Sequence, residues 1–168
     1  GKDLTGTILT GANMEYAKLT GANMEYAKLT GVDLSGANME YAKLTGVDFT
    51  QGMFIHTNFT NVKMDKTIFN QSNMTQVNMQ GASITEATII GAILNHANLS
   101  NANLTKTLLQ GTFLEFADLS NADLSHSNLF GVHLNNANLS GTNLYETKFN
   151  GVELDKANIE CINHPICN

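Results

Sequence analysis

The sequence contains no arginine, one proline, two cysteines and no run of 18 apolar residues. Nine lysines face 15 acidic residues, and the formal net charge is -6. The chain therefore lacks the clustered cationic groups that bind a nucleic-acid backbone. We expect no direct binding to DNA or RNA, and the acidic balance favours a basic partner. The absence of a long apolar run excludes a transmembrane helix, so no membrane insertion is expected.

Motifs that carry catalytic chemistry are also absent. The sequence has no glycine-rich phosphate loop, no nucleophile elbow and no H-E-x-x-H motif. Its five histidines are spread along the chain and form no ligand spacing. We therefore expect no enzyme, no catalytic or metal-binding residue, no cofactor and no small-molecule substrate.

The dominant feature that is present is a repeat of five residues. Large apolar side chains (Leu, Met, Phe or Ile) stand at every fifth position from Leu4 to Ile159, which gives 32 positions without an insertion. From Thr7 onward, a small side chain stands two residues before each of them, and 13 of the 14 glycines fall in the register 1, 6, 11 and so on, which is the second position after the large residue of a unit. This period matches neither the helical period of about 3.6 nor the strand period of 2. It favours a repeat architecture.

We interpret each unit as a short strand followed by a tight turn. The small and the large residue point inward across one intervening outward residue, and the next two residues form the corner. A type II turn needs positive φ at its second central residue, which suits glycine and secondarily asparagine. The interpretation therefore accounts for the position of the glycines.

The consensus small-(Asp/Asn)-large-x-x, as in Ala-Asn-Leu-Ser-Asn at 97–101 and Ala-Asp-Leu-Ser-Asn at 117–121, resembles the pentapeptide-repeat proteins over about residues 1–160. The resemblance implies an all-β fold, a right-handed quadrilateral β-helix (a solenoid) with about eight coils of four units. At roughly 4.8 Å per coil, the rod would be about 38 Å long. We assign the β-helix to 1–159 and a C-terminal cap to 160–168, where His164 and Pro165 break the register.

The inward positions predict the core. We expect Gly52, at a small position, to make room for three successive phenylalanine rings. The core residues we single out are Leu4, Phe49, Phe54, Phe59, Leu99, Leu119, Leu139 and Ile159.

The only cysteines, Cys161 and Cys167, either close a small disulfide loop or remain reduced thiols in the tail. The compartment stays open: it is cytoplasmic, or extracytoplasmic (lumenal, periplasmic or secreted) if the disulfide forms. No signal peptide is visible, and a sequence that begins at Gly1 leaves open whether a targeting segment was removed.

With four units per coil, outward residues that are four units apart in the sequence stack in columns along the rod. One column is almost entirely asparagine from Asn38 to Asn158, and we expect its amides to hydrogen-bond along the axis. Two adjacent faces carry apolar outward residues, which are typical of association with a partner. We expect a protein partner, with a homodimer as one form. The predicted interface consists of Ile68, Ile90, Ile93, Leu108, Phe113, Phe116 and Phe130.

Three functional hypotheses follow. The first is a non-catalytic scaffold for protein–protein interaction. The second, implied by the resemblance, is a DNA-mimicking binder of a type II topoisomerase (gyrase) that gives quinolone resistance. Against it, the acidic residues of the first coils are offset by lysines, and the projecting loops and helical dimer module of many such members are missing. The third is an extracytoplasmic structural protein, motivated by the two cysteines.

Overall fold

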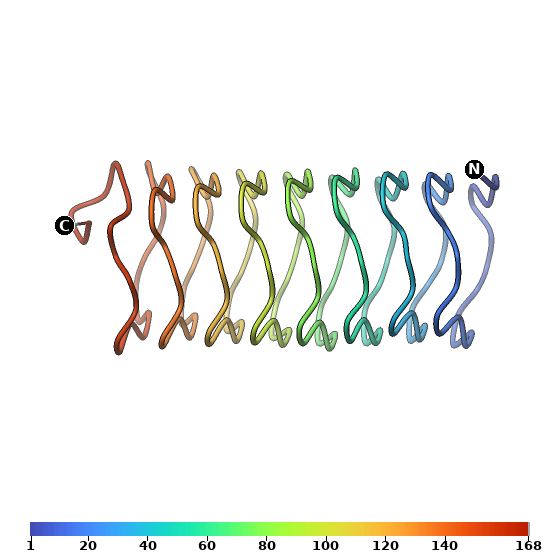
Figure 1. Ribbon diagram of the computed structural model, residues 1–168, viewed down its shortest axis with the longest axis horizontal. Coiled ribbons are helices and arrows are strands. Elements are labelled where there is room, and N and C mark those ends of the chain that lie inside the picture. The colour runs from blue at the N-terminus through green and yellow to red at the C-terminus, as the bar shows by residue number, and fades with distance from the viewer. Residues whose placement is uncertain (168) are drawn as a thin grey trace.

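A computed structural model describes residues 1–167, which form one rod of stacked coils with the two termini at opposite ends (Figure 1). These residues contain no helix, and each β element is a single residue in a parallel bridge. Every fifth residue from Asp3 to Asn138 pairs with the residue 20 positions later, beginning with Asp3 and Asn23. Each coil therefore comprises four of the five-residue units, one per side, as the quadrilateral β-helix requires.

Main-chain hydrogen bonds hold each coil to the next. The amide of Asn23 donates to the carbonyl of Lys2 (2.9 Å), and the amide of Leu4 donates to the carbonyl of Asn23 (2.7 Å). Within a coil, the amide of Thr7 donates to the carbonyl of Leu4 across the corner (3.2 Å). Because each coil contacts only its neighbours, stability is approximately a sum over coils and the interfaces between them.

The corners have the backbone conformation that the glycine pattern predicted. The second corner residue has positive φ in every unit from Gly6 (64°) to Lys156 (57°). Residues other than glycine adopt it too, including Tyr16 (56°) and Phe116 (60°), although this region costs an L-residue roughly 1–2 kcal/mol. The ring of Tyr16 lies over the next corner, since a Cβ added to Gly36 would come within 2.6 Å of it.

The aromatic part of the core contains four rings. Phe49, Phe54 and Phe59 are fully buried, as is Phe69, which the sequence-based list omits although it lies in the same register. The ring of Phe49 is 5.0 Å from that of Phe54 (edge-on) and 5.0 Å from that of Phe69 (stacked). A Cβ on Gly52 would lie 2.6 Å from the Phe54 ring, which confirms that glycine makes room there.

Burial of the other expected core residues depends on their place along the rod. Leu99, Leu119 and Leu139 are buried. Leu4 and Ile159 are only half-buried, because an end coil has a neighbouring coil on one side only.

The C-terminal residues depart from the register. Ile162 pairs with Asn143, 19 positions away instead of 20. A disulfide joins Cys161 and Cys167, whose Cα atoms are 4.9 Å apart, and the ring of His164 packs 5.3 Å from that of Phe149. We propose that residues 160–168 cap this end of the rod. Asn168 lies outside the residues that the structure describes.

Candidate protein-interaction surface

The seven residues of the predicted interface, which we call the apolar band, lie on two adjacent sides of the rod and their corners. Five of them are between 37% and 54% exposed, and Ile90 and Leu108 are half-buried. We call one of these sides the Phe113 face. It comprises the outward positions Asn13, Asp33, Met53, Asn73, Ile93, Phe113, His133 and Glu153, together with the positions two residues after each.

The structure brings only part of the apolar band together. Ile93 and Phe113 are bridge partners on consecutive coils. Thr88 separates Ile68 from Leu108 on the other side. The stacking of coils likewise places Gln110 between Ile90 and Phe130. The continuous apolar centre is therefore the Ile93–Phe113 pair.

Histidines stack on two of the exposed phenylalanines. The ring of His133 lies 4.7 Å from that of Phe113, with 12° between the ring planes. The ring of His96 lies 4.9 Å from that of Phe116, with 6° between the planes. Sequence reasoning did not identify these pairs. The signal was available, because the two members of each pair are four repeat units apart and so lie on consecutive coils.

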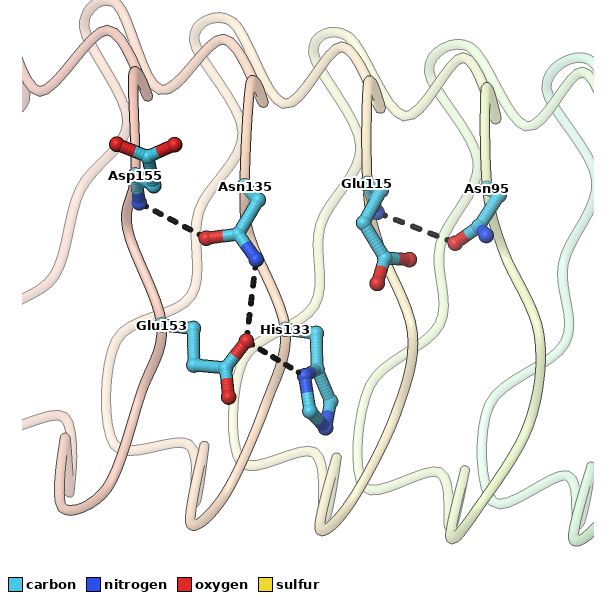
Figure 2. Close-up of polar contacts among 6 residues, drawn as sticks. All are labelled: Asn95, Glu115, His133, Asn135, Glu153 and Asp155. Atoms are coloured by element: carbon cyan, nitrogen blue, oxygen red, sulfur yellow. Dashed lines mark hydrogen bonds and ion pairs between the residues drawn. The ribbon is translucent and has the colours of Figure 1, made fainter.

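A polar network continues the Phe113 face toward the C-terminus (Figure 2). Oε2 of Glu153 accepts hydrogen bonds from Nδ1 of His133 (2.9 Å) and Nδ2 of Asn135 (3.0 Å). The hydrogen bond from His133 makes the largest contribution to lowering the pKa of Glu153, and the bond from Asn135 lowers it further. The amide Oδ1 of Asn135 accepts the main-chain N–H of Asp155 (2.8 Å).

The consensus Asp or Asn has a structural function that the sequence analysis missed. At the middle outward position, its Oδ1 accepts the main-chain N–H two residues later, as Asn98 does from Ser100 (3.0 Å) and Asp118 from Ser120 (3.0 Å). The ladder between coils does not use this N–H. An apolar residue at the same position supplies no acceptor, so it removes the partner of that N–H.

The preceding coil can supply the missing acceptor. Phe113 cannot accept the N–H of Glu115, and Oδ1 of Asn95 accepts it instead (3.2 Å; Figure 2). Oδ1 of Asn70 likewise accepts the N–H of Ile90 (3.0 Å), where Thr88 replaces the consensus residue. The apolar band is thus built into the fold with its backbone polar groups partly compensated.

The expected axial hydrogen bonds of the asparagine column form in part. Nδ2 of Asn138 donates to Asp118 (3.0 Å), and similar bonds of 3.3 Å join Asn58 to Asn38 and Asn158 to Asn138. We call this column, from Lys18 to Asn158, the asparagine face.

The interior of the rod is filled. Residues 1–167 form no pocket, and no group of three or more His, Cys, Asp or Glu residues among them could hold a metal ion. In the same range, no helix has the length and apolar character needed to cross a bilayer. What this part of the chain offers to other molecules is its outer surface.

Comparison with known proteins agrees with this geometry. The model of the pentapeptide repeats matches in eight copies, which together cover residues 1–160. A crystal structure of the pentapeptide-repeat protein Rfr23 from the cyanobacterium Cyanothece 51142 is similar over 54% of this chain, with 33% identity and a TM-score of 0.54. The chain spans 63% of the length of Rfr23.

Two other structures align over most of the chain. HetL, a pentapeptide-repeat protein involved in heterocyst differentiation regulation in Nostoc sp. strain PCC 7120, is 24% identical over 95% of this chain and 86% of its own, with a TM-score of 0.42. QnrB1, a plasmid-mediated fluoroquinolone resistance protein, is 18% identical over 97% of this chain and 88% of its own, with a TM-score of 0.47. No curated protein matches the chain significantly. From the family match and the four-sided coils, we conclude that this chain belongs to the pentapeptide-repeat family and folds as a right-handed β-helix.

Proposed function

We propose that this protein is a non-catalytic scaffold that binds another protein through the apolar band. The observation that carries the proposal is the exposed Ile93–Phe113 pair, with Phe116 and Phe130 exposed at the corners on either side. Contiguous apolar surface on an otherwise polar protein usually marks an interaction site. Aromatic side chains, phenylalanine included, are also enriched in the buried core of protein interfaces.

The rigidity of the rod supports this proposal. Main-chain hydrogen bonds join the strands of consecutive coils at Ile93 and Phe113, so the band does not have to fold before it binds. A preorganised surface loses little conformational entropy on association. Over residues 1–167, the outward surface of the filled rod also provides no desolvated cleft of the kind in which catalytic groups usually converge.

Site-specific photo-crosslinking tests the proposal. A photo-reactive amino acid is placed at Phe113, and in a separate variant at Asn101, an exposed corner residue diagonally across the rod. We expect discrete protein adducts from position 113 in cells that express the protein, and none from position 101. Identical products from both positions, or none from either, would contradict the proposal.

The DNA-mimic hypothesis is the second candidate, and it is supported by the excess of acidic residues. The low charge density of the rod argues against this hypothesis. Duplex DNA carries one negative charge per about 1.7 Å, so a rod of about 38 Å would need on the order of 20 charges to match it. The formal net charge of this chain is -6. A gyrase supercoiling assay with and without the protein separates the candidates, because a scaffold without this activity leaves supercoiling unchanged.

We also propose that the disulfide between Cys161 and Cys167 forms in the native protein, which would place it in an oxidising, extracytoplasmic compartment. Free thiols are counted under denaturing conditions before and after reduction. The proposal expects no free thiol before reduction and two after it. Two free thiols in protein isolated with its thiols trapped would favour the cytoplasm.

A further inference from the structure

Charge is distributed unevenly over the four sides of the rod. The outward positions of the Phe113 face carry no lysine, and Lys156, at a bordering corner, pairs with Asp155 at 3.9 Å. Acidic residues on this face occur near both ends and beside its apolar centre. They are Glu15, Asp33, Glu115, Glu153 and Asp155. Most of the formal net charge of -6 therefore lies on the side that exposes Ile93 and Phe113.

We infer that the Phe113 face binds a protein segment that carries both cationic and apolar side chains. The inference rests on the proposed function and names the chemistry of its partner. Ile93 and Phe113 form an apolar centre, Glu115 lies in the same unit as Phe113, and Glu153 lies two coils further along the same face. An apolar centre with a charged rim is the usual anatomy of a protein interface. Here every charged outward position of the face has the same sign, so the complementary segment is cationic.

The aromatic and acidic groups of this face are held in place before any partner arrives. His133 stacks on Phe113 at 4.7 Å and donates to Glu153 at 2.9 Å, while Asn135 donates to the same carboxylate oxygen. Figure 2 shows the imidazole and the amide converging on Glu153. Fixed side chains lose little rotamer freedom on binding. The Phe113–His133–Glu153 row is therefore a prepared contact surface for an apolar group next to a cation.

Glu115 supplies an independent reason for a cationic partner. Its Oε2 is shielded from solvent and has no hydrogen-bond partner within residues 1–167. A carboxylate oxygen that lacks both water and a donor is poorly solvated. Glu115 as a whole is only partly buried, so an ammonium or guanidinium group that approaches its exposed part would compensate the charge without contacting the shielded oxygen.

A second copy of the chain fits the Phe113 face poorly. In a two-fold symmetric dimer, the same patch of both protomers would be opposed. Two such faces would bring carboxylates toward carboxylates, with no lysine on either face to pair with them. Opposed like charges act against a partner. The charge pattern therefore favours a different protein over self-association.

The coil spacing sets the expected spacing of the partner's side chains. Phe113 and Glu153 lie two coils apart, which is about 10 Å along the axis. An extended chain advances roughly 3.3 Å per residue, so three residues cover this distance. A segment running along the axis would therefore place a lysine or arginine three residues from an aromatic side chain.

Fluorescence anisotropy with a labelled peptide tests the inference. The probe contains two copies of Phe-Ser-Thr-Lys, and the control peptides replace each Lys by Glu or each Phe by Ser. The test variant is Glu115→Gln with Glu153→Gln. The matched control is Glu40→Gln with Glu160→Gln. It removes the same amount of charge two residues after Asn38 and Asn158 of the asparagine face. We expect about fivefold weaker binding for the test variant, less than twofold for the control, and no binding of the glutamate peptide.

Three outcomes would overturn the inference. Equal weakening by both variants would mean that the peptide responds to net charge and not to this face. Full binding of the peptide without phenylalanine would exclude a role for the apolar centre. A dimer in light scattering that Phe113→Asp with Phe130→Asp makes monomeric would identify a second copy as the occupant. In the third case, adducts from position 113 would still support the proposed function, so the two failures are distinguishable.

Discussion

The asparagine face and the Phe113 face are built on the same coils but treat one main-chain N–H differently. On the asparagine face, each Asn or Asp from Asn38 to Asn158 accepts the N–H two residues later. On the Phe113 face, Asn13, Asp33 and Asn73 do the same, but Ile93 and Phe113 offer no acceptor. The Asn and Asp side chains of the asparagine face stabilise the fold by accepting these N–H groups, whereas Ile93 and Phe113 do not and are available for contact with a partner.

The difference shows that the acceptor of this N–H does not have to come from the consensus position. Four acceptors come from the preceding coil: Asp65 for Thr85, Asn70 for Ile90, Asn95 for Glu115, and Asn135 for Asp155. Each recipient unit has a residue other than Asn or Asp at its middle outward position. The rod can therefore expose Phe113 without losing the hydrogen bond of the Glu115 N–H.

The largest effect is expected on the asparagine face. In Asn98→Ala, the N–H and the hydroxyl of the buried Ser100 lose the oxygen to which both donate, at 3.0 and 2.7 Å. Loss of both bonds at a buried residue should cost about 2 kcal/mol of unfolding free energy. Urea denaturation measures it. Asn98→Asp, which keeps the oxygen, is the control, and equal stability of the two variants would refute the capping role.

A smaller effect is expected where the preceding coil supplies the acceptor. Asn95→Ala removes the acceptor of the Glu115 N–H, which is only partly buried, and should cost about 1 kcal/mol. Phe113→Asn places a new acceptor two residues before Glu115. In the Phe113→Asn background, Asn95→Ala should therefore cost much less stability than it does in the wild type. Additive effects in this double-mutant cycle would show that the two caps are not equivalent.

The register, the corner conformation and the buried positions could be predicted because each depends on residues within one unit. The number of units in a coil could not be obtained from the period of five, and it came from the family resemblance. The acceptor that Asn95 supplies to Glu115 and the stacking of Phe113 on His133 depend on which columns become neighbours. They require the length of the coil to be known first. The positions of the apolar band can be predicted from the sequence once the coil length is known. The partner of the band stays a proposal.

Low pH should destabilise the fold through Asp65, the one charged residue among the four acceptors from the preceding coil. Burial raises the pKa of Asp65, but hydrogen bonds from Ser83 and Thr85 together lower it by more, so the pKa of Asp65 lies below its ordinary value of 3.8. A lowered native pKa means that the ionised form stabilises the fold. This contribution is complete above the unfolded-state pKa and is lost as the pH falls through the native pKa.

Asp65→Asn keeps an acceptor oxygen and removes the charge. After allowance for solvent screening, we expect the wild type to be about 1 kcal/mol more stable than the variant near pH 6, and the difference to disappear near pH 2. Urea denaturation at both pH values measures it. Asp155→Asn serves as the control, because within residues 1–167 the exposed Asp155 side chain makes only a 3.9 Å pair with Lys156. A difference between wild type and Asp65→Asn that is independent of pH would be inconsistent with a role for the charge.

The smallest expected effect has the opposite sign and lies on the Phe113 face, far from its apolar centre. Met53 is 43% exposed, and the N–H of Ile55 has no acceptor within residues 1–167. Met53→Asn restores the consensus, so Oδ1 should accept that N–H and stabilise the fold by about 0.5 kcal/mol. Exposed methionine packing contributes little there, so the gain should not be cancelled. The same change at Lys43, on another face and two residues before Thr45, should give a similar gain, because the N–H of Thr45 likewise has no acceptor within residues 1–167. A loss of stability in both variants would mean that the consensus residue is favoured for a reason other than its oxygen.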